Sequence, residues 1–219
     1  MREALAADAV LELFATAQAI ERNAELLAGR DVAQISDKDA AALSETATPQ
    51  GLVAVCRLEQ PRLADVLARS PRLLVALVEP NDPGNLGTVI RTADAAGADA
   101  VLVDGGVDPY NGKAVRASAG SLFHLPVVEC TIDELTSTGM TTLATSGTGD
   151  ADLDDLIDAG TLAGPTLWLF GSEAHGLPPS VLAAADHRVR IPIHGRAESL
   201  NLAASAAVCL YASARAHRR

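Results

Sequence analysis

Residues 73–87, which read LLVALVEPNDPGNLG, decide the fold of this 219-residue chain. The first six, Leu73–Val78, form a continuous apolar run, which is typical of a strand covered on both faces of a parallel sheet. The polar loop after it contains two glycines, which allow a ligand to approach the backbone closely. The loop leads into a helix that we expect over residues 86–96, with Asn85 as its N-cap and Gly97 at its end.

Strands and helices continue to alternate after this stretch, which predicts an α/β fold with a parallel sheet and helices on both faces. We expect further strands over residues 100–103, 126–128, 141–145, 165–170 and 189–191, and helices over 113–118, 132–135, 153–157, 178–184 and 200–216. Ligands of such sheets bind beyond the carboxyl ends of the strands, so the loops at those ends are the candidate functional segments.

A smaller α/β unit precedes this sheet. Its pattern predicts helices over residues 2–7, 17–27 and 40–43, and strands over 11–15, 32–35 and 52–56. We therefore divide the chain into a first domain over residues 1–57, a polar and proline-marked linker over 58–71, and a second domain over 72–219. Because the first unit opens directly on a helix, we expect that a strand upstream of it is missing.

The composition excludes several classes of protein. With 48% hydrophobic and 21% charged residues, the chain is neither disordered nor collagen-like. Its apolar runs fall short of the ~20 residues that span a bilayer, and its start lacks the apolar core of a secretory signal. The spacing of Cys56, Cys130 and Cys209 fits neither a disulfide framework nor a zinc motif. We expect buried thiols in a reducing cytoplasm, with no membrane and no metal partner.

The charge is distributed unevenly along the chain. Seventeen basic residues against 28 acidic ones give a net charge of −11, whereas a general nucleic-acid binder is usually basic. Residues 187–219, however, contain six arginines and one acidic residue, Glu198. A local basic region of this kind can still bind phosphate.

Two more loops that carry candidate functional side chains follow predicted strands. Residues 171–178 read GSEAHGLP and place Glu173 between two glycines. Residues 192–201 read PIHGRAESLN, in which Ser199 is a natural N-cap for the last helix. We interpret His175 as an ordinary loop residue, because nothing pairs it with a nucleophile. Ser199 is not a hydrolase nucleophile, because it lies outside a G-x-S-x-G elbow.

Three motifs together resemble the SpoU (TrmH) family of RNA 2′-O-ribose methyltransferases in the SPOUT superfamily. They are Asn85-x-Gly87-x-x-x-Arg91-Thr92-Ala93, Phe170-Gly171-Ser172-Glu173-x-x-Gly176 and Ser199-Leu200-Asn201-Leu202-Ala203-Ala204-Ser205. The resemblance covers residues 73 to about 214. Residues 111–121 are similar to the corresponding segment of family members that act on ribosomal RNA. Residues 1–56 resemble most of the ribosomal-protein-L30e-like substrate-binding domain of that branch, without its usual start.

The resemblance implies a C-terminal trefoil knot formed by the second and third motifs, S-adenosylmethionine bound in that knot, and a homodimer. It assigns the catalytic positions to Asn85, Arg91, Glu173, Ser199 and Asn201. It assigns cofactor contacts to Gly171, Ile191 and Leu200, and we expect Thr145 and Gly147 to border the same pocket. Our candidates for RNA phosphate contacts are Lys113, Arg116 and Arg196.

Arg91 corresponds to the arginine that the family is proposed to use in catalysis, often drawn as a general base. An arginine pKa near 13.8 is far from neutrality, and lowering it to about 7 costs roughly 9 kcal/mol. We therefore expect Arg91 to hold the acceptor phosphate and to stabilise the developing alkoxide. We also expect Asn85 and Glu173 to hydrogen-bond to each other and to orient Arg91.

The favoured function is S-adenosylmethionine-dependent methylation of a ribose 2′-hydroxyl in RNA, with 23S ribosomal RNA as the favoured substrate. Three alternatives stay open: a tRNA 2′-O-methyltransferase, a non-catalytic RNA-binding protein that keeps the fold, and a methyltransferase that confers antibiotic resistance. A nicotinamide-dependent oxidoreductase is disfavoured, because the loop with Gly84 and Gly87 lacks the G-x-G-x-x-G spacing.

Overall fold

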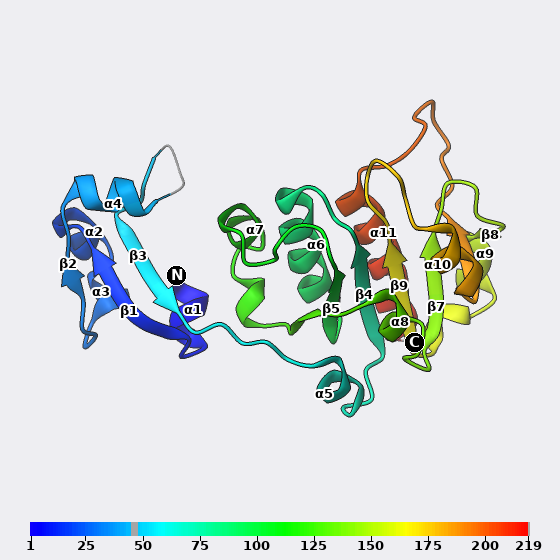
Figure 1. Ribbon diagram of the computed structural model, residues 1–219, viewed down its shortest axis with the longest axis horizontal. Helices are drawn as coiled ribbons and strands as arrows, with labels where there is room; N and C mark the ends of the chain where they lie inside the picture. The colour runs from blue at the N-terminus through cyan, green and yellow to red at the C-terminus, as the bar shows by residue number, and fades with distance from the viewer. Residues whose placement is uncertain (45–47, 219) are drawn as a thin grey trace. The chain divides into compact units, whose positions relative to one another are not determined.

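The computed structural model describes residues 1–44 and 48–218, which form two compact units, Met1–Glu59 and Gln60–Arg219 (Figure 1). The first unit holds a three-stranded sheet in the order β2-β1-β3, in which β1 is parallel to β2 and antiparallel to β3. Its strands are β1 (Val10–Ala15), β2 (Ala33–Gln34) and β3 (Leu52–Cys56), and its helices are α1 (Arg2–Ala6), α2 (Ala17–Arg22), α3 (Ala24–Leu27) and α4 (Asp37–Leu43).

Local hydrogen bonds explain where the helices of the first unit begin and end. The Oγ of Ser36 accepts a hydrogen bond from the backbone N–H of Asp39 and caps α4, which therefore begins at Asp37, three residues before the predicted start. The helix predicted over residues 17–27 is interrupted at Asn23, whose side-chain amide donates to the carbonyl of Ala19 at 2.8 Å. An asparagine that bonds its own helix in this way competes with helix continuation, so α2 and α3 are separate.

The second unit holds a seven-stranded parallel sheet in the order β6-β5-β4-β9-β7-β10-β8, which confirms the predicted α/β class. Its strands are β4 (Leu73–Val78), β5 (Ala100–Asp104), β6 (Val127–Glu129), β7 (Thr141–Thr145), β8 (Ala151–Asp152), β9 (Thr166–Phe170) and β10 (His187–Arg190). Its α-helices are α5 (Leu63–Leu67), α6 (Pro83–Ala96), α7 (Gly112–Ala117), α8 (Ile132–Leu135), α9 (Leu153–Asp158), α10 (Pro179–Ala184) and α11 (Leu202–Ala216). Short 3₁₀ helices lie at Ser121–Phe123 and Thr161–Ala163.

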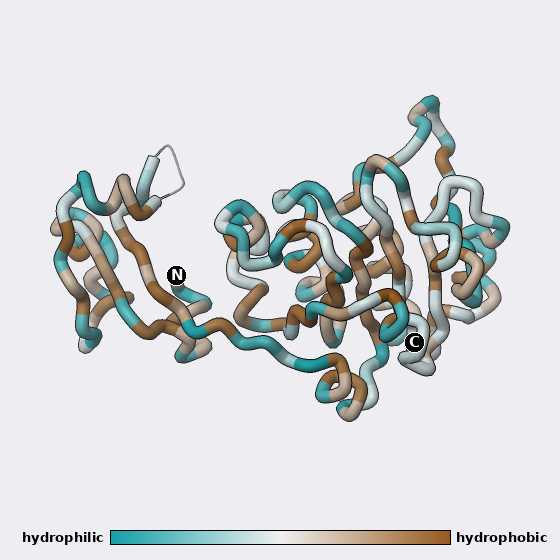
Figure 2. The backbone as a smooth tube through the Cα atoms, in the orientation of Figure 1, coloured by the Kyte–Doolittle hydropathy of each residue, from teal (hydrophilic) through white to brown (hydrophobic). Residues whose placement is uncertain are grey.

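The apolar run of β4 is buried on both faces, as predicted. Leu73, Val75 and Leu77 belong to a core that also includes buried residues of α6 and α11. Leu74, Ala76 and Val78 belong to a second core, together with residues of α5 and α10. The middle strands are accordingly coloured as hydrophobic in Figure 2. This double burial explains why β4 has no polar alternation.

The segment predicted as a linker, residues 58–71, contains a helix instead. Within it, α5 places Leu63 and Val66 in the second core of the sheet domain. The flanking prolines suggested a loop, but Leu63, Ala64 and Leu67 favour a helix, and the buried Leu63 and Val66 hold it against the sheet. The boundary between the two compact units accordingly lies between Glu59 and Gln60.

Two predicted helix starts in the second unit are wrong. Helix α6 begins three residues early, at Pro83, and its N-cap is Asp82, whose carboxylate accepts from the N–H of Gly84. Proline at the first helical position needs no N–H partner, which favours this earlier start. Helix α11 begins at Leu202 with Asn201 as its N-cap, so Ser199 does not cap it. The knot predicted at this end of the chain stays a prediction.

The cysteines are free thiols, but only Cys209 is fully buried, whereas Cys56 and Cys130 are half-buried. Burial, assisted by the charges of Glu134 and Asp104, raises the pKa of Cys130 to about 12. Among the described residues, no helix is long and apolar enough to cross a membrane.

Candidate active site

The candidate site lies at the carboxyl ends of the central strands. β4 and β9 are neighbours there, and the chain order reverses at this pair, since β5 lies beyond β4 and β7 lies beyond β9. Such a switch point is where open parallel sheets bind ligands. The first turn of α6, just after the loop that follows β4, carries Asn85 to this edge of the sheet, and the loop after β9 carries Glu173 there.

A directed series of hydrogen bonds joins three of the predicted catalytic residues. The Oδ1 of Asn201 caps α11 by accepting from the N–H groups of Ala203 and Ala204, at 2.9 and 3.3 Å. Its Nδ2 must therefore donate, and it donates to Asn85 Oδ1 at 3.1 Å. Asn85 in turn donates from Nδ2 to Glu173 Oε1 at 2.6 Å.

This series explains why Asn85 does not cap α6. Asn85 lies within the first turn of that helix, and its side chain bonds to Glu173 and Asn201. Its amide thus connects the loop after β9 to the start of α11. The predicted Asn85–Glu173 hydrogen bond is present in the structure.

A pocket of about 660 Å³ opens among the loops that follow β7, β9 and β10 and the start of α11. All five residues predicted to contact or border the cofactor line it, namely Thr145, Gly147, Gly171, Ile191 and Leu200. Of the predicted catalytic residues, Glu173, Ser199 and Asn201 also line it. The structure therefore brings together in one pocket residues that are more than 50 positions apart in the sequence.

The second-motif loop is folded back on itself so tightly that only glycine fits at its start. A Cβ on Gly171 would lie 2.0 Å from the carbonyl carbon of Gly176 and 2.2 Å from the nitrogen of Leu177. The loop is closed by the N–H of Gly176, which donates to the carbonyl of Ser172 at 2.8 Å. Nearby, the hydroxyl of Thr145 donates to the Leu169 carbonyl at 3.0 Å and ties the end of β7 to β9.

Arg91 is not placed as predicted. It is exposed and lies six residues after Asn85 on α6, which puts it about 120° around the helix from Asn85. Within the part of the chain that the structure describes, no hydrogen bond joins Arg91 to Asn85 or Glu173, and Arg91 does not line the pocket. The expectation that these two residues orient Arg91 is therefore wrong for this structure.

The three candidates for phosphate contacts lie on the surface outside the pocket lining. Lys113 is on α7, where its ammonium forms an ion pair with Asp82, the N-cap of α6. The Lys113 ammonium and the Gly84 N–H hold the pKa of Asp82 below its ordinary value. Arg116 is exposed on the same short helix, and Arg196 is exposed in the loop between β10 and α11.

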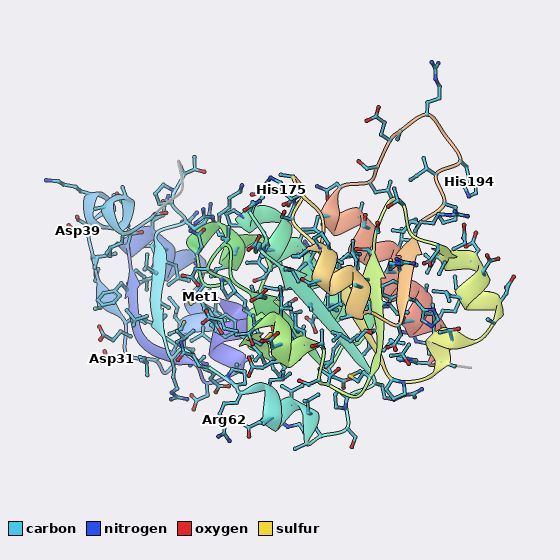
Figure 3. All side chains as sticks on the ribbon, turned by 45° about the vertical axis from the view of Figure 1, so that its right-hand side comes forward. Met1, Asp31, Asp39, Arg62, His175 and His194 are labelled. Carbon is cyan, nitrogen blue, oxygen red and sulfur yellow. The ribbon has the colours of Figure 1, made fainter. Side chains whose placement is uncertain are left out.

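The structure adds pocket residues to which the sequence assigned no role in the site. They are chiefly hydroxyl and apolar side chains: Ser146, Thr148, Phe170, Ser172, Leu177, Leu182, Val189, Ile193, Leu202 and Ser205. The polar loop after β7 is the one signal that could have indicated Ser146 and Thr148. His175, interpreted from sequence as an ordinary loop residue, also lines the pocket, and Figure 3 shows it in the loop after β9 and His194 in the loop before α11.

Comparison with known proteins identifies the family of the unit that carries this site. The sequence model of the SpoU rRNA Methylase family matches residues 72–211. The chain belongs to this SpoU family.

Two curated relatives of this SpoU chain illustrate the match. The 23S rRNA (guanosine(2553)-2′-O)-methyltransferase RlmP of Bacillus subtilis is 38% identical over 192 residues, which cover 85% of this chain and 74% of that protein. The 23S rRNA (uridine(2479)-2′-O)-methyltransferase of Streptomyces viridochromogenes is 36% identical, over 76% of this chain and 61% of that protein.

A solved structure shows that the likeness extends to three dimensions. The AdoMet-bound rRNA methyltransferase from Sinorhizobium meliloti superposes with a TM-score of 0.82 at 30% identity, and it covers 98% of this chain and 85% of that one. The pocket of the SpoU chain fits the same cofactor, because its volume suits a nucleoside-sized ligand and Gly171 and Gly147 expose backbone groups to it.

Proposed function

We propose that this SpoU chain transfers a methyl group from S-adenosylmethionine to a ribose 2′-hydroxyl of 23S ribosomal RNA. The observation that carries the proposal is the series Asn201–Asn85–Glu173, which ends on a pocket lined by every residue matched to cofactor contacts. The names of the curated relatives support the substrate class.

Thr145, Gly147, Gly171, Ile191 and Leu200 would hold the cofactor, largely through backbone groups. When bound, S-adenosylmethionine supplies an activated methyl group, so the S–CH₃ electron pair stays on sulfur while the ribose oxygen forms the O–CH₃ bond and loses its proton. The protein must therefore orient the ribose hydroxyl and receive or release one proton.

Glu173 is held in place for orienting the hydroxyl. Its Oε1 accepts from Asn85, and its second oxygen can accept from the ribose. Because Asn201 fixes the amide of Asn85, rotation of the Glu173 carboxylate would break its hydrogen bond to that amide. Ser199, also in the pocket lining, can offer a further hydroxyl to the substrate.

Arg91 would bind the acceptor phosphate and stabilise the developing alkoxide. The exposure of its side chain on α6 suits an RNA contact, and its high ordinary pKa disfavours a role as base. Lys113, Arg116 and Arg196 would contribute further phosphate contacts.

Residues 1–57 would form an L30e-like RNA-binding domain and residues 72–219 the catalytic domain. Val208 and Tyr211 are exposed three residues apart on α11, so they are neighbours on the surface of that helix, and an adjacent apolar pair of this kind supports a homodimer. We also infer a knot formed by the second and third motifs, and a cytoplasmic location, which the free cysteines support.

The testing experiment incubates the protein with radiolabelled S-adenosylmethionine and separate pools of unmodified ribosomal RNA and tRNA. We expect label in ribosomal RNA, lost in Arg91→Ala and Glu173→Gln but kept in Glu129→Gln, a carboxylate outside the pocket. Arg91→Lys should also lose most activity, because lysine lacks the bidentate fork of arginine.

Other outcomes decide among the alternatives. Label in tRNA alone would favour the tRNA 2′-O-methyltransferase. Cofactor binding by titration without label in either pool would favour the non-catalytic RNA-binding protein. No cofactor binding at all would contradict the methyltransferase proposal.

A further inference from the structure

The pocket lining carries negative charge that no basic side chain balances. Its carboxylates are Glu173 and Glu198, and across residues 1–44 and 48–218 no lysine or arginine lines it. His175 supplies the imidazole of the lining. A positively charged ligand is therefore electrostatically favoured there.

The two carboxylates are held differently. Glu173 accepts the short hydrogen bond from Asn85 and is thus the last member of the hydrogen-bonded series Asn201–Asn85–Glu173. Glu198 lies in the exposed loop between β10 and α11, directly before Ser199 and Leu200, and no residue in the described ranges hydrogen-bonds or ion-pairs with its carboxylate. Its charge is thus available to a ligand in the pocket.

Methyl transfer changes the charge of the cofactor. S-adenosylmethionine carries a sulfonium cation, whereas the product S-adenosylhomocysteine carries a neutral thioether at the same position. A carboxylate beside the pocket stabilises the first and leaves the second nearly unaffected.

We propose that Glu198 is a specificity-determining residue that makes the pocket prefer the sulfonium cofactor over its thioether product. This inference rests on the proposed cofactor pocket. The consequence is weaker retention of the product after each turnover. Because Glu198 is exposed, solvent screens the effect, and we expect it to change the ratio of the two dissociation constants by about three- to tenfold.

The test is isothermal titration of the full chain with S-adenosylmethionine, S-adenosylhomocysteine and sinefungin, in which a protonated amine replaces the sulfonium. We expect Glu198→Gln to lower the affinity for both cationic ligands by about three- to tenfold, while the affinity for S-adenosylhomocysteine changes less than about twofold. Glu198→Asp keeps the charge and should keep most of the preference. Glu129→Gln, outside the pocket, controls for net charge.

Ionic strength provides a second readout. Raising the salt from about 0.05 M to about 0.5 M should reduce the preference of the unmodified protein more than that of Glu198→Gln, which keeps only the Glu173 carboxylate in the lining. An unaltered emission of the buried Trp168 would show that the variant is folded.

The outcomes separate this inference from the proposed function. If the unmodified protein binds neither nucleoside, the cofactor pocket is wrong and the inference is overturned with it. If both bind and Glu198→Gln leaves their ratio unchanged, the inference alone is overturned.

Discussion

At the residue scale, one amide performs two tasks. Asn201 caps α11 with its oxygen and holds Asn85 with its nitrogen, so the start of a helix and the orientation of Glu173 depend on the same side chain. Ser199, two residues earlier, lines the pocket without capping the helix.

The two tasks of Asn201 are separable by substitution. Asn201→Asp keeps an N-cap acceptor but loses the donor to Asn85, so we expect nearly unchanged unfolding free energy and a large loss of methyl transfer. Asn201→Ala should lose activity and about 1 kcal/mol of stability as well. Ser199→Ala should change stability by less than about 0.5 kcal/mol. Urea denaturation and the labelling assay measure both quantities, and a strongly destabilised Ser199→Ala would contradict the capping assignment.

At the element scale, the site depends on how closely its loops can fold. The loop after β9 packs its own backbone around Gly171, and α6 approaches α7 at Gly87, where a Cβ would lie 2.3 Å from the carbonyl oxygen of Ala114. A single methyl group at either position forces backbone to move.

Gly171→Ala should therefore open the loop. We expect its affinity for S-adenosylmethionine to fall by about tenfold or more, because the added Cβ collides with backbone atoms of Gly176 and Leu177 that no side-chain rotation can move. Gly164→Ala is the matched control, since nothing lies within 4 Å of a Cβ there. Wild-type affinity in Gly171→Ala would show that the loop does not form the cofactor site.

A second element-scale feature ties β7 to the turn before β10. The carboxylate of Asp186 accepts from the N–H and the hydroxyl of Thr142, both at 2.8 Å, and these bonds hold its pKa below the ordinary value. Its stabilising contribution is fully present above the unfolded pKa of about 3.9 and is lost as the pH falls through the lower folded value.

The melting temperatures of the unmodified protein and Asp186→Asn should thus differ by a constant amount from about pH 8 to about pH 5, and converge below about pH 4. The difference should be modest, because Asp186 is exposed and solvent screens its charge. Glu129→Gln serves as the exposed control. A difference that grows with acidification would contradict this account.

At the scale of the whole molecule, two units have cores of very different size. The first relies on a buried cluster of Leu5, Leu13 and Leu27, whereas the second has two large cores on the two faces of its sheet. A unit of about 59 residues buries a smaller fraction of its surface and is only marginally stable.

We expect the two units to melt separately. The chain's single tryptophan, Trp168, is fully buried in the second unit and donates to Ser213 Oγ at 2.9 Å, so its fluorescence reports that unit alone. Far-ultraviolet circular dichroism, which detects both units, should show an earlier transition that the fluorescence lacks. S-adenosylmethionine should raise only the fluorescence transition. Coincident curves from both methods would contradict independent units.

Much of this arrangement could be predicted from the sequence. The apolar runs of β4 and β9 and the glycine-rich loops after them predicted the parallel sheet and the location of the site, and the three motifs predicted the family. The short strand β8 escaped prediction, because two residues carry no periodicity. Helix α5 escaped because five residues between proline-containing segments are too few to show a helical period.

The sequence by itself determined the layered fold, since continuous apolar strands alternating with helices have few other ways to bury their surfaces. It also determined which residues are polar at the strand ends. Only the tertiary structure decided that Asn201 rather than Ser199 caps α11, that Asn85 accepts from Asn201 instead of capping α6, and that Arg91 lies away from Asn85 and Glu173. The physical reason is that a side-chain amide has several possible partners, and the partner that it takes depends on which distant loop the sheet brings within hydrogen-bonding distance.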